Sequence, residues 1–206
     1  MNSPKIGAIA GFSAPIVAII CILLSIATYP AFSWTNNALS DLGVVSGVTQ
    51  WLFNGGLCVA GGLVLIFAIF GLHHYVNKTW AGRVGSGVFG VASIMLGLIG
   101  VFNESFAPVH LMVAVAFFIL VPIALFILTI NFYQTRQYTI ARFTVTIAII
   151  TALPWILQLT LPYVSNVAIP ETISSLSISA WTIGISTKIH KPTQNTTNPT
   201  IKVPGC

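Results

Sequence analysis

The stretch Ser33-Trp-Thr-Asn-Asn-Ala-Leu-Ser-Asp-Leu-Gly43 is the first polar interruption in a chain that is otherwise almost entirely apolar. It contains Asp41, one of only three acidic residues in the sequence; the other two are Glu104 and Glu171. A polar loop between two long apolar runs is typical of a chain that has just crossed a bilayer. We therefore predict a bundle of transmembrane helices arranged around an outward-facing acidic layer that begins in this loop.

The composition points to a membrane protein. Of the 206 residues, 56% are hydrophobic and only 5% are charged, whereas ordinary globular chains carry about 25% charged residues. So few charges cannot cover a water-exposed surface, and lipid must be the main solvent of the chain. The formal net charge of +5 comes from single, scattered basic residues. This distribution argues against a nucleic-acid partner and is typical of membrane-orientation signals.

Six apolar runs are long enough, or nearly so, to cross a hydrocarbon core of about 30 Å as helices. The fold class predicted is all-α: a polytopic membrane protein with a six-transmembrane-helix bundle in residues 1–187. Residues 188–206 are rich in Thr, Asn and Pro, and we expect them to form a disordered cytoplasmic tail. The expected spans are 7–29, 48–72, 85–102, 108–130, 143–161 and 171–186.

The basic residues predict the orientation of this bundle. With six spans, all eight fall on one side of the membrane: Lys5, Lys78, Arg83, Arg136, Arg142, Lys188, Lys191 and Lys202. The positive-inside rule makes that side cytoplasmic, so both termini are expected in the cytoplasm of a multi-pass plasma-membrane protein. The three acids and His110 then fall on the outer side.

Small and polar residues form stripes along three of the expected helices. In the third span, a face of Gly and Ser continues in steps of three and four to Glu104, which should therefore point into the bundle and not toward lipid. The sixth span carries a similar stripe of hydroxyl side chains that begins at Glu171. The Gly and Ser faces of the second and third spans predict close helix contacts, either within the chain, in a homo-oligomer or with a partner in a membrane complex.

The outer layer supplies the candidate functional site. Its candidate catalytic residues are Asp41, Glu104, His110 and Glu171, and its candidate substrate-binding residues are Asn37, Ser40, Asn54 and Asn103. Carboxylates with an imidazole could bind a divalent metal that keeps a position open for water. They could equally act as general acid and base, or line a pathway for protons or cations. The cofactor, and whether there is catalysis at all, stay open at this stage.

Structural roles for the same residues are equally open. Glu171 follows Pro170 at a helix start, where free N–H groups and the helix dipole favour a carboxylate. Asp41 could simply accept hydrogen bonds from neighbouring loop amides. Glu104 could pair with His110 and fix the turn between two helices.

The residues also resemble a known family. The motif Asn37-Ala-Leu-Ser-Asp-Leu-Gly43, the segment Trp51-Leu-Phe-Asn54, the Gly-rich span ending in Phe102-Asn-Glu104, and His110 are similar to those of the domain of unknown function 998 family. The resemblance covers roughly residues 7–187. It implies a six-helix membrane protein of bacteria or archaea and no established activity. A more distant likeness is to the Frag/DRAM membrane proteins, some of them linked to lipid remodelling, and the composition would suit an archaeon.

Three functions follow as hypotheses. The first is an integral membrane protein with a lipid- or metal-related site at its outer face, acting as a hydrolase or a lipid-modifying enzyme in contact with membrane lipids. The second is a small transporter or ion pathway, with a polar route that continues inward along the hydroxyl stripe of the sixth span. The third is a non-catalytic subunit of a larger membrane complex.

Overall fold

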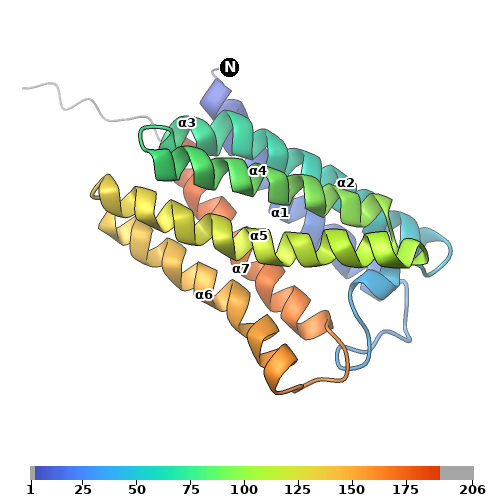
Figure 1. Ribbon diagram of the computed structural model, residues 1–206. Helices are drawn as coiled ribbons and strands as arrows, with labels where there is room; N and C mark the ends of the chain where they lie inside the picture. The colour runs from blue at the N-terminus through green and yellow to red at the C-terminus, as the bar shows by residue number, and fades with distance from the viewer. Residues whose placement is uncertain (1–2, 191–206) are drawn as a thin grey trace, which may run out of the picture.

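The computed structural model describes residues 3–190, and these form an all-α structure without β-strands (Figure 1). The predicted tail therefore lies outside the described residues from position 191 onward. The long helices are α1 (Ser3–Ala27), α2 (Val48–Ile66), α4 (Trp80–Val101), α5 (Ala107–Gln134), α6 (Tyr138–Thr160) and α7 (Ala168–His190). A π-helix (Phe67–Leu72) joins α2 to the short α3 (His73–Val76), and 3-10 helices form at Ser40–Gly43 and Glu104–Phe106.

Five helical segments within the described residues are long and apolar enough to cross a membrane, so this is a helical membrane protein. They are Ser3–Ala27, Val48–Val76, Trp80–Val101, Glu104–Gln134 and Tyr138–Thr160. The remaining long helix, α7, is 23 residues long but does not qualify because of its composition. Its sequence carries many Ser and Thr side chains, which lower its hydropathy.

Contacts at α7 explain why so polar a helix can be accommodated. The Ser174 hydroxyl donates to the Thr151 carbonyl at 2.8 Å and accepts from the Trp155 indole N–H at 3.0 Å. Seven residues further along α7, the Trp181 indole N–H donates to the Thr144 hydroxyl at 3.0 Å. Polar groups on α7 and α6 thus satisfy one another instead of facing lipid, where unpaired groups would be costly.

The small-residue stripe of the third predicted span lies against α2. A Cβ atom added to Gly61 would collide with the backbone of Gly97, and one added to Gly100 would collide with the Asn54 carbonyl. Glycine is therefore needed at these positions for the two backbones to approach so closely. By contrast, Gly55 and Gly62 on α2 have open space beside them. The contact of these faces with an oligomer or complex partner stays a proposal.

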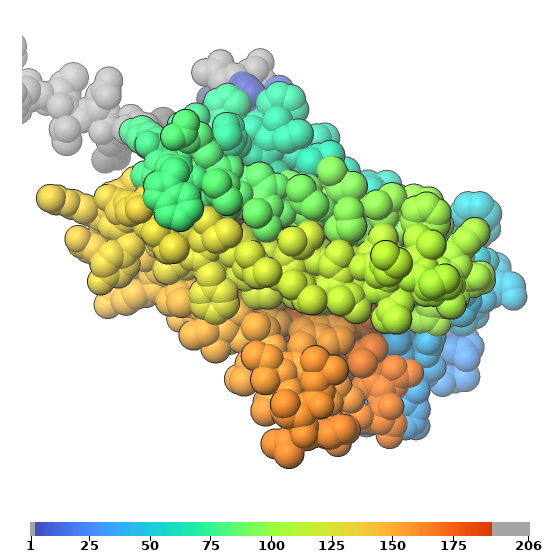
Figure 2. Space-filling model, in the orientation of Figure 1, coloured from blue at the N-terminus to red at the C-terminus, as the bar shows by residue number. Residues whose placement is uncertain are grey.

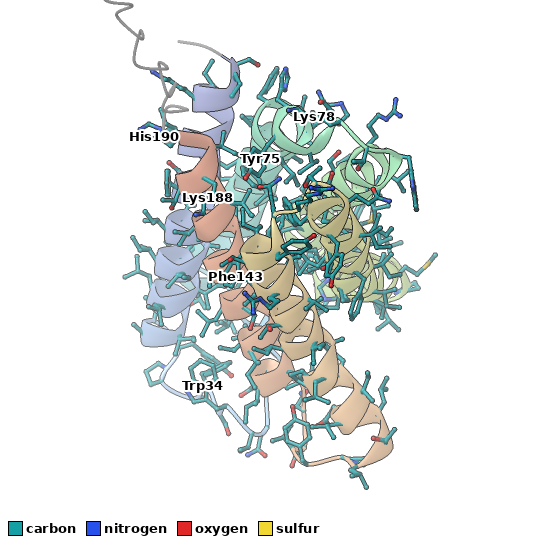
Figure 3. The ribbon with its side chains drawn as sticks, turned by 90° about the vertical axis from the view of Figure 1, so that its left-hand side faces the viewer. Trp34, Tyr75, Lys78, Phe143, Lys188 and His190 are labelled. Carbon is teal, nitrogen blue, oxygen red and sulfur yellow. The ribbon has the colours of Figure 1, made fainter. Side chains whose placement is uncertain are left out.

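The two ends of the bundle differ in charge. Figure 3 shows Lys78, Lys188 and His190 at one end and Trp34 toward the other. We call the end with Lys78, Lys188 and His190 the basic end. The opposite end contains loops 28–47, 102–106 and 161–167, and we call it the acidic end.

Helices α5 and α6 diverge along the bundle. In Figure 1 they lie close at the basic end, where residues 135–137 connect them, and move apart toward the acidic end. The surface between the two helices is hollowed there, as the yellow and orange atoms of Figure 2 show.

Candidate functional site

Asp41 is held by its own loop. Its Oδ2 atom accepts a hydrogen bond from the Asn37 side-chain amide at 2.6 Å and another from the Ala38 backbone N–H at 3.1 Å. The Asn37 side-chain oxygen in turn accepts from the Ser33 N–H at 2.9 Å. Asn37, a candidate substrate-binding residue, thus belongs to a compact turn that fixes the direction of the Asp41 carboxylate.

The same loop is hydrogen-bonded to the start of α7. The Asn166 and Ala168 N–H groups donate to the Thr35 and Asn37 carbonyls, both at 3.0 Å. Glu171, which is 8% exposed, accepts a hydrogen bond from the Leu39 N–H on its Oε2 atom at 2.6 Å. A hydrogen bond of this length to a carboxyl oxygen is short for an N–H donor. One oxygen of Glu171 is therefore used for structure, and the other is left for a further partner.

His110 lies one turn into α5 and is also 8% exposed. Its Nδ1 atom is 2.7 Å from the Phe102 carbonyl oxygen at the end of α4. A carbonyl oxygen only accepts hydrogen bonds, so Nδ1 carries the proton. In the neutral ring the lone pair is then on Nε2, which is the atom able to accept a proton from a ligand.

Glu104 joins these groups from the 3-10 helix Glu104–Phe106. Asn103 caps this helix, because its side-chain oxygen accepts from the Ser105 N–H at 3.0 Å. The Glu104 carboxyl is close to the Ser40 hydroxyl, the Asp41 carboxyl and the His110 ring. The side chain thus faces the neighbouring elements of the acidic end, although Glu104 does not continue the helical stripe of the third predicted span, because α4 ends at Val101.

Asp41, Glu104, His110 and Glu171 line one cavity of about 510 Å³. This volume is within the range of small-molecule sites, roughly 300–1,000 Å³. Ser40 and Asn166 add polar groups to the lining. The rest of the wall is almost entirely apolar and comes mainly from α5 and α6: Leu111, Ala114, Val115, Phe118, Ile119, Trp155 and Leu159. The cavity is amphipathic, with its polar groups gathered from the three loops of the acidic end and from the first turns of α5 and α7.

Three of the candidate substrate-binding residues lie outside the cavity lining, and only Ser40 lies within it. Asn37 orients Asp41, and Asn103 caps the turn that carries Glu104. Asn54 donates to the Gly43 carbonyl at 2.9 Å and thereby supports the 3-10 helix that contains Asp41. In this structure the contacts of these three amides position the acids.

A shared metal ion is not supported by the side-chain geometry. Within residues 3–190, no three His, Cys, Asp or Glu side chains are arranged so that they could hold one ion together. The Asp41 and Glu171 oxygens that have structural hydrogen bonds accept them from loop amides. The donor set fits hydrogen bonding and charge pairing better than it fits a tetrahedral or octahedral ligand shell.

Sequence reasoning missed the cavity wall contributed by α6 and its following loop. Trp155, Leu159 and Asn166 line the cavity, but in the sequence the first two lie within one long apolar run. The nearest signal is Pro154, which removes a helical hydrogen bond and often changes the direction of a helix. That signal predicts an irregularity in α6 without indicating which side chains face the interior.

Two smaller cavities continue from the large one into the bundle. The first, about 40 Å³, is lined by Ser40, His110 and Glu171 together with Ser175. The second, about 70 Å³, is lined by Ser175, Ser179 and Thr182 of α7 and by Ser93 of α4. Phe67, Phe89 and Trp181 are each at most 2% exposed and pack with ring centroids 5.3–6.5 Å apart. We call these three residues the aromatic cluster.

Comparison with known families identifies the chain. The family model described as "Protein of unknown function (DUF998)" matches residues 12–188. The chain belongs to this family. The resemblance inferred from the motifs around Asp41 and Glu104 is therefore confirmed, whereas the likeness to the Frag/DRAM proteins stays a prediction. No curated protein and no solved structure matches this DUF998 chain.

Proposed function

We propose that this DUF998 protein binds the head group of a membrane lipid at the outer face of the plasma membrane and hydrolyses or otherwise modifies it. The observation that carries the proposal is the amphipathic cavity. Four ionisable side chains gather at its polar side, and its apolar wall comes from two helices that diverge toward the acidic end. A lipid has the same division into a polar head and an apolar chain.

The proposal includes six crossings with both termini in the cytoplasm. α7 has 23 residues, which at 1.5 Å per residue give about 34 Å, enough to cross the hydrocarbon core. The Ser174 hydroxyl and the Trp181 indole N–H find partners on α6, and Thr172, Ser177, Thr182 and Thr187 bond to carbonyls of α7 itself, so its low hydropathy is compatible with a crossing. The positive-inside rule then assigns the basic end to the cytoplasm and the cavity to the outer leaflet.

The cavity contains the groups that acid–base chemistry needs. His110 Nε2 is able to accept a proton from an attacking water molecule. Glu104 and Asp41, lying side by side, are able to share one proton and donate it to a leaving oxygen. In a hydrolysis, water would add its hydroxyl to the reacting carbon or phosphorus, and its proton would pass to His110.

The cavity can be filled without changing any of the ionisable residues. Ala114 lines it, whereas Ala116, two residues further along α5, lines none of the three cavities described above. We expect lipid that copurifies with the wild-type protein in mild detergent to be reduced several-fold in Ala114→Leu and retained in Ala116→Leu, as measured by mass spectrometry. Equal lipid content in both variants would contradict the proposal.

A second experiment tests the chemistry. Protein reconstituted in vesicles of its native lipid extract should release a head group or a fatty acid, and His110→Gln should stop the release. If the wild-type protein binds lipid but releases neither product, the binding part of the proposal is supported and the hydrolysis part is contradicted.

A transporter or ion pathway is the second candidate function. The observation that favours it is the pair of small cavities that follow Ser175, Ser179 and Thr182 inward from Glu171. The aromatic cluster borders the end of this path, because Phe89 lines the inner cavity and packs on Phe67 and Trp181. A conducting protein would have to move this cluster. Proton flux into vesicles that increases in Phe89→Ala but not in Phe126→Ala would support this function.

A further inference from the structure

The ionisable groups around the large cavity are mainly acidic. Three carboxyl groups and one imidazole line it, and its lining contains no Lys or Arg. All the Lys and Arg side chains in the described residues belong to the basic end: Lys5, Lys78, Arg83, Arg136, Arg142 and Lys188. The protein therefore provides no Lys or Arg to balance carboxylates in this cavity, and His110 is the one basic side chain in its lining.

Two polar side chains that are more than nine-tenths buried face the cavity with an unused atom. Glu171 binds the Leu39 N–H through Oε2, and no protein donor in residues 3–190 binds its Oε1. His110 uses Nδ1 on the Phe102 carbonyl, which leaves Nε2 without a protein partner in the same part of the chain. Neither atom is fully enclosed by protein, so both are open to the cavity and available to a ligand that can hydrogen-bond with them.

Two aromatic rings also line the cavity. Phe118 and Trp155 line the cavity with their ring centroids 4.5 Å apart and their planes at 43°. The Trp155 N–H is bonded to Ser174, which fixes the indole against α7. Aromatic faces attract cations such as ammonium groups, most strongly where water is excluded.

From this arrangement we infer that the preferred ligand is an amphiphile with a cationic nitrogen head group and an alkyl chain. Asp41, Glu104 and Glu171 would balance the charge of the nitrogen, and the apolar wall of α5 and α6 would hold the chain. This inference rests on the proposed function, because it names the class of lipid-like molecule that the same cavity takes. An anionic phosphate or sulfate head group would meet three carboxyl groups and no positive side chain other than His110.

Three ligands with alkyl chains of equal length test whether the cavity prefers a cationic, an anionic or a neutral head group. Wild-type protein in nanodiscs is equilibrated with dodecyltrimethylammonium, dodecyl sulfate or dodecyl maltoside, and the amount bound is measured by dialysis. The amount bound to Ala114→Leu is subtracted to remove partition into the bilayer. We expect about tenfold tighter specific binding of the cation than of the other two, the size of effect that an unscreened charge pair produces. Tetramethylammonium, which has no chain, should bind far more weakly.

Variants test the charge itself. Glu104→Gln keeps the shape of the side chain and should weaken binding of the cation by about tenfold while leaving dodecyl maltoside unaffected. Leu159 is 82% exposed and lines the cavity, so Leu159→Lys introduces a positive charge without disturbing the core. This variant should also weaken binding of the cation and should improve binding of dodecyl sulfate.

The outcomes distinguish the two proposals. Equal binding of dodecyl sulfate and dodecyltrimethylammonium would overturn the inference and leave a lipid site without a preference for charge. Strong binding of tetramethylammonium would also overturn it and leave a simple cation site. Specific binding of none of the three amphiphiles would overturn the proposed function.

Discussion

The Leu39 backbone N–H donates a hydrogen bond to Glu171 Oε2 at 2.6 Å, although the two residues are 132 positions apart in the sequence. This bond joins the first loop of the acidic end to the beginning of the last helix. It makes Glu171 a structural residue and a cavity residue at once. The structural role differs from the one predicted, because the donor is a loop N–H and not a free N–H at the start of α7. The candidate catalytic role of Glu171 stays a prediction.

Replacing Glu171 should separate these two roles. Glu171→Ala leaves the buried Leu39 N–H without an acceptor, which costs about 1–3 kcal/mol in the free energy of unfolding. Glu171→Gln keeps an acceptor oxygen and should cost less. Thermal unfolding in detergent, followed by circular dichroism, measures both. Thr172→Ala is the control, because the Thr172 hydroxyl bonds only within its own helix turn, to the Ala168 carbonyl. Equal destabilisation by Ala and Gln would show that the Leu39 bond contributes little.

Two adjacent glycines on α2 provide a test of the packing between α2 and α4. An added methyl group on Gly61 would collide with the backbone of Gly97, whereas Gly62 has open space. Gly61→Ala should therefore destabilise the protein by about 1–3 kcal/mol, as other overpacked sites do. Gly62→Ala should be neutral or stabilising by up to about 1 kcal/mol, because Ala is the better helix former. The order of the two melting temperatures is the measurement, and a reversed order would contradict the close contact.

Sidedness can be tested by labelling in intact cells. In a variant without its native cysteines, Asn36→Cys at the acidic end should react with a membrane-impermeant maleimide. Asn77→Cys, which is equally exposed but lies at the basic end, should react only after the cells are permeabilised. His190→Cys at the end of α7 should behave like Asn77→Cys. Labelling of His190→Cys in intact cells would mean that α7 does not cross.

The aromatic cluster should contribute strongly to stability. Phe89 is 2% exposed and contacts both Phe67 and Trp181, so Phe89→Ala is expected to cost about 3–5 kcal/mol in the free energy of unfolding. Phe126 on α5 is 44% exposed, and Phe126→Ala should cost much less. Unfolding in increasing concentrations of denaturing detergent gives the comparison. Similar costs for the two variants would indicate that the cluster is loosely packed.

Composition and run length were sufficient to predict an all-α membrane protein, because the scarcity of charge excludes a water-exposed surface. Glu104 lines the cavity, but the Gly and Ser stripe does not explain this, because α4 ends at Val101 and Glu104 belongs to a separate 3-10 helix. The roles of Asn37, Asn54 and Asn103 were not predictable, because a loop amide looks the same in a sequence whether it binds substrate or supports a turn. The role of Trp155 was not predictable either, because its partner Ser174 is on another helix and the contact is evident only when α6 and α7 are placed side by side.

The closure of the inner cavities by Phe67, Phe89 and Trp181 has a consequence for the membrane as a whole. If the proposed path from the acidic end stops at this cluster, a molecule that enters would leave through the opening by which it came. Anything altered there would return to the leaflet that supplied it. A protein of this shape could change the chemistry of one half of the bilayer while the other half, and the ion gradients across both, stayed as they were.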